Sequence, residues 1–458
     1  MRGVTERSSF RGSTAESPLL TPYPPLPIHP CFRYTVTMYQ DALNAAGLGA
    51  ADILLPAAGT DMQKWAVIAC DQYTQDRAYW ERVRAFAGDA PSTINLILPE
   101  AFLPDAGFDA QKAAIHETMR RYRRAVFAPP RRCCVYVERL CGAGVRQGLV
   151  AALDLDAYDW RPGAKTLARA TEDTVPDRLP PRMALRRGAA LETPHSMVLF
   201  DDPADLILPA LAKTAKQQMP LYDTDLFEGA GHVSGWPLEG EALELAARAF
   251  QDALKNAERG AGAGNAPFLF AVGDGNHSLA AAKAIWEEHK KAHAGEERLA
   301  EHPLRWALVE LVNLYSPALR FEPIHRVLFN VDMDTVLSVL RAVPGLEARP
   351  AGAHCAAVQT TGALAAAALV EPALEALTRE RQGIRIDYLH GEEETRRVAE
   401  AAAGGGGSAA ASAVGVLLPP FAKEGLFASV ARGGPLPRKS FSMGAARDKR
   451  FSLECRGL

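Results

Sequence analysis

Long apolar runs are absent from this chain of 458 residues. No segment reaches the ~18–20 consecutive apolar residues that a transmembrane helix needs, and the N-terminal residues lack the apolar stretch of a secretory signal. Basic residues are not in excess either, because the formal net charge is -3. General attraction to nucleic acid or to an anionic membrane is therefore not expected. We predict a cytoplasmic protein that binds neither membranes nor nucleic acid, and the oligomeric state stays open.

Cysteines with the spacing of a metal site are missing as well. The seven cysteines are an odd number, and none of them forms a Cys-x-x-Cys pair. A disulfide framework and a structural zinc site are therefore not expected. The chain also lacks a lysine-containing P-loop and a Gly-x-Ser-x-Gly elbow, so a nucleotide would have to be bound in another way.

Strand-like and helix-like stretches alternate from Met38 onward, which predicts an α/β or α+β fold with a mixed sheet. Residues 1–37 are rich in proline and serine and are expected to form a disordered extension, with a start of translation at Met1 or at Met38 both open. We expect a main α/β domain over residues 38–330 and a second α/β lobe over residues 331–458. Within that lobe, residues 402–413 form a Gly/Ala-rich linker that we expect to be flexible.

The sharpest motif joins an apolar strand, Pro267–Val272, to a helix that is expected from about Ser278 to His293. Gly273 and Gly275 allow positive φ and close backbone approach in the loop between them. The helix N-terminus that follows suits a phosphate group. The alternative is a simple corner of strand, turn and helix, with Ser278 as the N-cap of the helix.

The side chains of this loop suggest specific roles. Asp274 could hold a metal ion or a hydroxyl group, and His277 could donate to a phosphate oxygen. Asn276 lies between Gly275 and His277 in the same loop.

Three further segments carry charged or hydroxyl groups in patterns that suit anions or proton transfer. In Phe321–Arg326, His325 and Arg326 could reach one anion from two directions, although a core histidine beside a surface arginine is the simpler interpretation. In Pro437–Phe441, two cations next to a hydroxyl group, Arg438, Lys439 and Ser440, could clamp a phosphate, or could form a solvated basic turn.

The third segment, Arg169–Thr174, contains Glu172 between hydroxyl-bearing residues. Glu172 could act as a general base, whereas the local pattern also fits a helix start that is capped by Thr171. Asp71, after a strand end, and His195, in a Thr-Pro-His-Ser loop, are weaker candidates.

From Met38 to Leu458 the chain resembles the bacterial proteins that are grouped as domain of unknown function 1015. The resemblance is carried by Val272–Leu279, Leu308–Asn313, Phe321–Arg326 and Pro437–Met443. That family is in turn distantly similar to the free serine kinases of the ParB/sulfiredoxin superfamily. The resemblance implies a ParB/sulfiredoxin-like core with an additional α/β lobe.

Three kinase landmarks occur in matching order. Arg169–Glu172 matches a Lys-Pro-His-Glu segment with a catalytic-base glutamate, and Asp274–Ser278 matches an Asp-Gly-His-His-Arg loop that holds nucleotide phosphates. Pro437–Phe441 matches a C-terminal Pro-Lys-Thr-Thr-Arg-His segment. Ser278 stands where the kinases have an arginine, so Arg326 or Arg438 would have to supply that charge.

The resemblance implies phosphoryl transfer to a metabolite hydroxyl, with L-serine as the leading acceptor and ATP, ADP or pyrophosphate as the donor. Mg²⁺ would bridge the donor oxygens beside Asp274, and Glu172 would take the proton. The transferring phosphate would be held by His325, Arg326, Lys439 and Ser440. Two other function classes stay open: a nucleotide-binding sensor or scaffold without catalysis, and a ParB-like DNA-binding or nuclease module.

Overall fold

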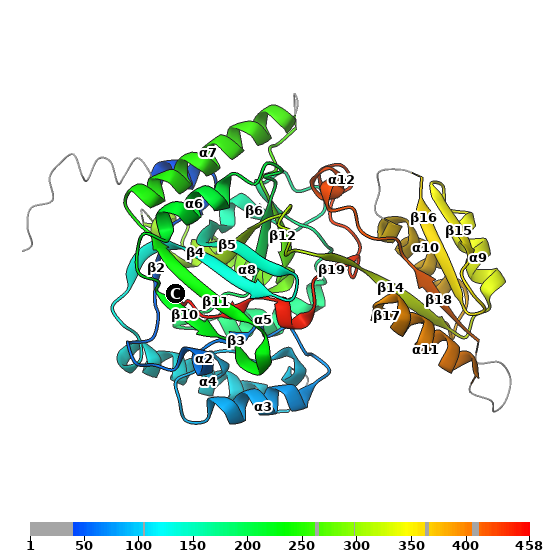
Figure 1. The fold of residues 1–458 in the computed structure, drawn as a ribbon, viewed down its shortest axis with the longest axis horizontal. Helices are drawn as coiled ribbons and strands as arrows, with labels where there is room; N and C mark the ends of the chain where they lie inside the picture. Colours follow the sequence, from blue (N-terminus) through cyan, green and yellow to red (C-terminus); the bar gives the residue numbers. More distant parts are fainter. Residues whose placement is uncertain (1–39, 104–105, 262–264, 297, 362–365, 405–411) are drawn as a thin grey trace, which may run out of the picture.

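The computed structural model describes residues 40–103, 106–261, 265–296, 298–361, 366–404 and 412–458. The expected extension over residues 1–37 and the alternative start at Met38 lie outside these ranges. The described chain contains a larger body, built on an eleven-stranded sheet, and a smaller lobe, built on a six-stranded sheet (Figure 1). The predicted α/β class with mixed sheets is confirmed.

The large sheet has the strand order β10-β11-β4-β5-β13-β9-β12-β7-β6, with β1 added to β5 and β2 added to β4. Most neighbours are antiparallel, but β13 and β9, β12 and β7, and β7 and β6 are parallel pairs. Its strands are β1 Leu48–Gly49, β2 Ala51–Ile53, β4 Arg131–Cys141, β5 Gly144–Asp154, β6 Tyr158–Asp159, β7 Ala168–Ala170, β9 Met197–Phe200, β10 Tyr222–Asp225, β11 His232–Leu238, β12 Phe270–Asp274 and β13 Trp306–Asn313.

The central strand β4 shows why this sheet is covered on both faces. Residues 133–137 of β4 are all buried and apolar, and successive side chains of a strand point to opposite faces. Cys134 and Tyr136 accordingly pack into one core, and Cys133, Val135 and Val137 pack into the other. The strands β4 and β5 pair with each other in an antiparallel hairpin.

Helices form a layer on each face of the sheet. One face is covered by α6, α7 and α8, and the other face by α2, α3 and α4. The helices of the larger body are α2 Met62–Trp65, α3 Arg77–Ala87, α4 Phe108–Ala125, α5 Leu179–Arg186, α6 Ile207–Ala215, α7 Glu241–Ala261 and α8 Asn276–Ala292.

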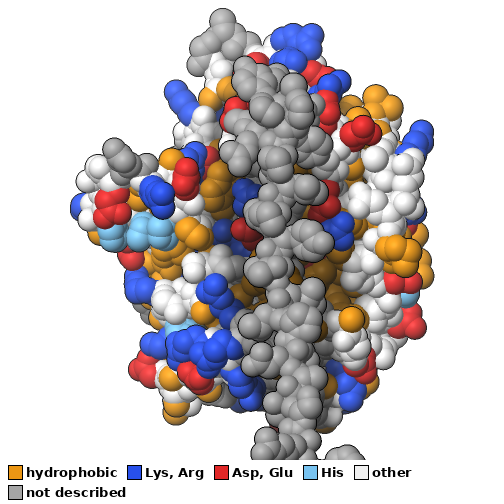
Figure 2. Space-filling model, turned by 90° about the vertical axis from the view of Figure 1, so that its left-hand side faces the viewer, with side chains coloured by type: hydrophobic (Ala, Val, Ile, Leu, Met, Phe, Trp, Pro, Cys, Tyr) orange, Lys and Arg blue, Asp and Glu red, His pale blue; other side chains and the backbone are white. Residues whose placement is uncertain are grey.

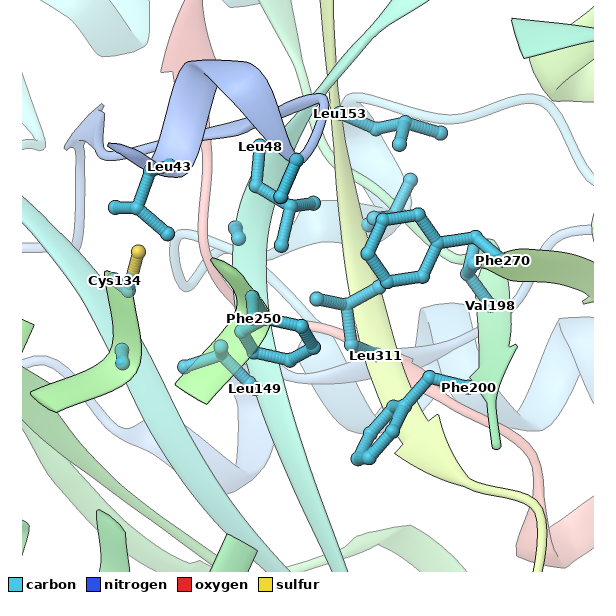
Figure 3. Close-up of a cluster of buried hydrophobic side chains, with 14 of the residues drawn as sticks. Leu43, Leu48, Cys134, Leu149, Leu153, Val198, Phe200, Phe250, Phe270 and Leu311 are labelled. Atoms are coloured by element: carbon cyan, nitrogen blue, oxygen red, sulfur yellow. The ribbon is translucent and has the colours of Figure 1, made fainter. Parts of the chain in front are cut away.

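The core under α6, α7 and α8 is built from aromatic and aliphatic side chains. Figure 3 shows Phe250 of α7 between Leu149 of β5 and Leu311 of β13. The rings of Phe200 and Phe250 meet edge to face, with 5.5 Å between their centroids. Leu279 and Trp286 of α8 belong to the same core, which fixes the start of α8 against the sheet.

The smaller lobe has the strand order β15-β16-β18-β14-β17, and β19 pairs with the first residues of β14. Helices α9 and α10 pack on one face of this sheet, and α11 packs on the other. Its elements are β14 Phe321–Phe329, α9 Met333–Arg341, β15 Leu346–Pro350, β16 Cys355–Thr360, α10 Ala366–Glu380, β17 Arg385–His390, α11 Glu392–Gly404, β18 Ala413–Leu417 and β19 Phe441–Met443. The helix α12 Leu426–Gly433 packs instead against β9, β12 and β13 of the larger body.

After β19 the chain returns to the larger body. The short strand β20 Phe451–Ser452 pairs with β3 Val67–Ile68, and β21 Arg456–Gly457 pairs with β8 Leu191–Glu192. The strand β14, in contrast, begins before residue 331 and belongs to the second sheet. The chain thus enters the second sheet before residue 331 and returns to the larger body after β19. The expected domain boundary at residue 330 stays a prediction.

Two sequence-based expectations about local structure are wrong. Residues 171–174 do not start a helix, because Thr171 donates through its backbone and its hydroxyl to the Val272 carbonyl instead. The helix after the glycine loop begins at Asn276, so Ser278 is not its N-cap. Of the expected linker over residues 402–413, residues 405–411 lie outside the described part of the chain, so its flexibility stays a prediction. Residues 402–404 belong to α11, and Ala413 begins β18.

The outer surface of the larger body carries mixed charge. On the face shown in Figure 2, basic and acidic side chains of the described residues are interspersed with apolar ones. Among the described helices, none combines the length and the apolarity that a bilayer crossing requires.

Gly275→Ala should destabilise the fold. Gly275 has a φ of 76°, and a Cβ atom there would lie 2.5 Å from the Ser196 hydroxyl oxygen and 2.9 Å from its Cα. The left-handed conformation alone costs an alanine about 1–2 kcal/mol, which urea unfolding would detect. Gly260→Ala, in open space within α7, is the matched control and should be neutral or stabilising by up to about 1 kcal/mol. Equal stability of Gly275→Ala and the wild type would contradict this account of the turn.

Candidate functional site

The glycine loop lies where β12 ends and α8 begins. Its two glycines make room for neighbouring side chains: a Cβ atom on Gly273 would lie 2.7 Å from the sulfur of Met443, and one on Gly275 would meet Ser196. Met443 belongs to β19, so the segment after Lys439 is packed directly on the loop. Close packing within the protein is therefore sufficient to require both glycines.

The first turn of α8 presents unused polar groups. The Leu279 amide is the first one that donates back into the helix, to the Gly275 carbonyl at 3.0 Å. The amides of residues 276–278 have no acceptor among the described residues, as is usual for a helix N-terminus. Asn276 Oδ1 is a buried oxygen that also lacks a hydrogen bond within the described part of the chain, whereas Asp274 Oδ2 lies 3.3 Å from the Lys449 ammonium. The loop therefore offers amide donors beside one unsatisfied oxygen.

Glu172 lies between the glycine loop and the C-terminal loop. Its neighbour Thr171 is hydrogen bonded to Val272 of β12, and the Leu436 amide donates to the Thr171 carbonyl at 2.7 Å. The Glu172 carboxylate accepts the backbone amides of Ser440 at 2.9 Å, Lys439 at 3.2 Å and Phe441 at 3.4 Å. Segments that are more than 260 residues apart in the sequence are joined by this one side chain.

The protonation of Glu172 is shifted toward neutrality. Burial raises the pKa of the Glu172 carboxyl to about 7, although the three amide hydrogen bonds act in the opposite direction. A carboxyl group with this pKa exists in both protonation states near pH 7, which suits a group that accepts and returns a proton.

The C-terminal loop exposes two cations above Glu172. Lys439 has a φ of 62° and an exposed side chain. The Arg438 guanidinium is also exposed and lies 5.7 Å from the centroid of the Tyr388 ring of β17. The Ser440 hydroxyl donates to the Pro437 carbonyl at 2.6 Å, so it stabilises the turn. The loop thus offers Lys439 and Arg438 to an anion and uses Ser440 to keep its own shape.

His277 is held as a neutral hydrogen-bond donor. Its Nε2 accepts the Val175 amide at 3.2 Å, so the ring proton is on Nδ1. Burial and the nearby charges of Arg182 and Arg178 lower the pKa of His277 to about 4. The Nδ1–H group can therefore donate to a ligand, but the ring brings no positive charge to the site at neutral pH.

A buried lysine next to the loop was not predicted from the sequence. Lys449 is only 6% exposed, and its Nζ lies 3.3 Å from Asp274 Oδ2. Burial raises the pKa of Asp274, and the charge of Lys449 opposes this effect. Lys449 stands in a charged tail that has no recognisable motif, so only its position in space reveals it.

The two weaker candidates are next to Asp274. The charge of Asp71 raises the pKa of Asp274, and that of His195 lowers it. His195 Nε2 lies 3.8 Å from Asp71 Oδ2. The pKa of His390, at the end of β17, is lowered by burial and then by the charges of Lys439 and Lys449, so both lysines are near the smaller lobe.

The predicted pairing of His325 and Arg326 on one anion is not supported. Neighbouring residues of a strand point to opposite faces, and both residues lie in β14. Arg326 is 0% exposed and binds Glu371 through Nε at 3.0 Å and Nη2 at 2.9 Å. His325 is buried and accepts the Leu418 amide at 3.1 Å. Both side chains therefore stabilise the smaller lobe, and Arg326 does not replace the kinase arginine.

A divalent cation could be held here only with the help of a ligand. Within the described ranges, no group of three or more His, Cys, Asp or Glu side chains is arranged for a metal ion. Asp274 Oδ2 lies 3.3 Å from Lys449 Nζ, and Asp71 is another carboxylate whose charge raises the pKa of Asp274. Mg²⁺ is commonly bound by one or two carboxylates together with substrate phosphates and water, so the donor set fits Mg²⁺ that arrives with a phosphate.

Glu172→Gln should change how stability depends on pH. With a pKa near 7 in the folded state, against about 4.3 when unfolded, the folded state binds one more proton between these values. Stability of the wild type should therefore fall, relative to Glu172→Gln, as the pH rises from about 4.5 to about 7. Urea unfolding across this range measures the difference, and Glu241→Gln, at an exposed position in α7, is the control. Parallel curves for wild type and Glu172→Gln would show that Glu172 titrates normally.

Comparison with solved structures finds distant similarity. A variant of free serine kinase in complex with AMP has a TM-score of 0.34 and 12% identity, over 68% of this chain and 92% of that chain. A conserved hypothetical protein from Pyrococcus furiosus has a TM-score of 0.30 and 11% identity, over 68% and 94%. SbnI from Staphylococcus aureus, truncated at its C-terminus, has a TM-score of 0.30 and 10% identity, over 65% and 83%.

A search of curated proteins finds no match. The family model described as protein of unknown function (DUF1015) matches residues 54–379, so the chain belongs to this family.

Proposed function

We propose that this protein transfers a phosphoryl group from a nucleotide or pyrophosphate to the hydroxyl of a small metabolite, with L-serine as the leading acceptor. The observation that carries the proposal is the position of Glu172. Its carboxyl, with a pKa of about 7, lies between the amides of Lys439–Phe441 and the strand that leads into the glycine loop.

The donor would bind at the first turn of α8. The free amides of residues 276–278 and the partial positive charge of the helix N-terminus suit phosphate oxygens. His277 Nδ1–H would add a neutral donor, and Lys439 would add a positive charge. Such a site acts mainly by positioning the reactants and neutralising the transferring group, which is what phosphoryl transfer requires.

In the reaction, the acceptor hydroxyl would lose its proton to the Glu172 carboxylate. The acceptor oxygen would form a bond to the terminal phosphorus of the donor as the bond between that phosphorus and the leaving phosphate oxygen breaks. Mg²⁺ held by Asp274 and the donor oxygens would supply further charge neutralisation. Lys449, 3.3 Å from Asp274, would keep that carboxylate ionised and oriented.

A nucleotide sensor without catalysis is the second candidate function. It is favoured by the three amide hydrogen bonds of Glu172, since a carboxylate that holds a loop has a structural role whether or not it accepts a proton. The two functions differ in outcome, because a sensor would be stabilised by ADP or ATP and would give no phosphorylated product with any acceptor.

Lys439→Ala and Glu172→Gln should each reduce turnover strongly. Loss of one electrostatic contact to the transferring group commonly costs about 10²–10³ in rate, and loss of a general base costs about 10²–10⁴. The assay is a screen of ATP, ADP and pyrophosphate against serine and related hydroxyl metabolites, followed by phosphorus NMR.

Lys213→Ala is the matched control, because Lys213 is an exposed lysine on α6 that has no assigned role in the site. It should retain wild-type turnover. Undiminished turnover in Lys439→Ala or Glu172→Gln would remove that residue from the mechanism, and the absence of product with every donor and acceptor would favour the sensor.

A further inference from the structure

A cavity of about 160 Å³ lies behind the first turn of α8. Ser278 of α8 and His195 of the loop before β9 line it, so the cavity shares a wall with the candidate site. Arg182 of α5 lines it as well, and its charge also acts on His277. The cavity is therefore a neighbour of the donor site, and none of its residues has been assigned to the donor except Ser278.

Most of the cavity wall is apolar. Leu96, Leu98, Ile115, Met119 and Leu308 contribute to it. The volume is close to the ~150 Å³ of an apolar cavity that takes up benzene, so about six non-hydrogen atoms would fill it. A space of this size and character suits a short branched carbon chain better than it suits a polar metabolite.

Two polar residues that line the cavity have buried nitrogen atoms without a hydrogen bond among the described residues. Arg186 binds Glu192 through Nη1 at 2.5 Å, but its Nε and Nη2 are buried without an acceptor among the described residues. Glu192 is not available as an acceptor for these two groups, because its other oxygen accepts hydrogen bonds from Arg456 and the Leu308 amide.

His195 is a second such group. It is 8% exposed, and its Nε2 has no hydrogen bond among the described residues. Buried donors are nearly always paired, so these atoms indicate an oxygen-bearing ligand in the cavity. An arginine with two N–H groups available recognises a carboxylate well.

We propose that this cavity binds the aliphatic part of a small hydroxy or amino acid and that Arg186 binds its carboxylate. The inference goes beyond the proposed function, since Glu172 and Lys439 are not among the residues that line the cavity. The cavity favours a carbon skeleton larger and more apolar than that of L-serine, so this acid is a second ligand, distinct from the proposed acceptor.

Calorimetric titration of the full-length protein with 2-hydroxy-3-methylbutanoate tests the cavity without any donor. Binding should be measurable for the wild type at millimolar concentrations. Glycolate lacks the branched chain and 2-methylpropan-1-ol lacks the carboxylate, so each should bind at least about tenfold more weakly, a difference of about 1.4 kcal/mol.

Two variants remove the two halves of the site. Arg186→Met removes the carboxylate ligand, and Leu185→Phe, at a half-buried lining position, fills the apolar part while leaving the charges in place. Each should weaken binding at least about tenfold. Arg187→Met is the matched control, because Arg187 follows Arg186 and pairs with Glu288 on the surface, and it should bind like the wild type.

Absence of binding to the wild type, or equal affinity in wild type and Leu185→Phe, would overturn the proposal, and this second comparison holds even if Arg186→Met fails to fold. The experiments distinguish failure of the cavity proposal from failure of the kinase proposal. Binding that depends on Arg186, without phosphoryl transfer to any acceptor, would leave the carboxylate site and refute the kinase. Transfer to L-serine without binding of the branched acid would leave the kinase and refute the cavity assignment.

Discussion

The candidate site depends on the hydrogen bonds from the backbone amides of Lys439, Ser440 and Phe441 to the Glu172 carboxylate. They hold the C-terminal loop beside the glycine loop, to which Thr171 is already joined through Val272. The same contacts bury the carboxylate, and burial raises its pKa to about 7. One side chain thus fixes the geometry of the site and acquires the protonation behaviour that a general base needs.

The smaller lobe approaches this arrangement from the other side. Arg438 lies over Tyr388 of β17, and Lys439 and Lys449 both act on the pKa of His390 at the end of the same strand. Since β14 leaves the larger body and β19 pairs with its first residues, the two sheets are connected next to the loop that Glu172 holds. A ligand on the exposed cations would therefore contact a place where the two parts of the chain meet.

Sequence patterns predicted the local elements well, because short-range hydrophobic periodicity encodes them. The strand β12 and the turn at Gly275 follow from an apolar run and from glycine. Contacts between residues that are far apart in the sequence were harder to predict. The local pattern fits Thr171 as a helix cap, but Thr171 donates its hydrogen bonds to Val272, 101 residues away. The local pattern suggested Arg326 as an anion ligand, but Arg326 binds Glu371, 45 residues further along the chain. Lys449 carries no local signal, and only the folded chain places it beside Asp274.

Hydrogen–deuterium exchange with and without ADP, ATP or pyrophosphate tests the central claim most directly. If the glycine loop and the C-terminal loop grip one anion, the same ligand should slow exchange in peptides covering residues 271–279 and residues 436–443, and the two effects should saturate at the same concentration. Protection of only one of these peptides, or of neither with all three ligands, would contradict the account, because it would show that the two loops do not form one phosphate site.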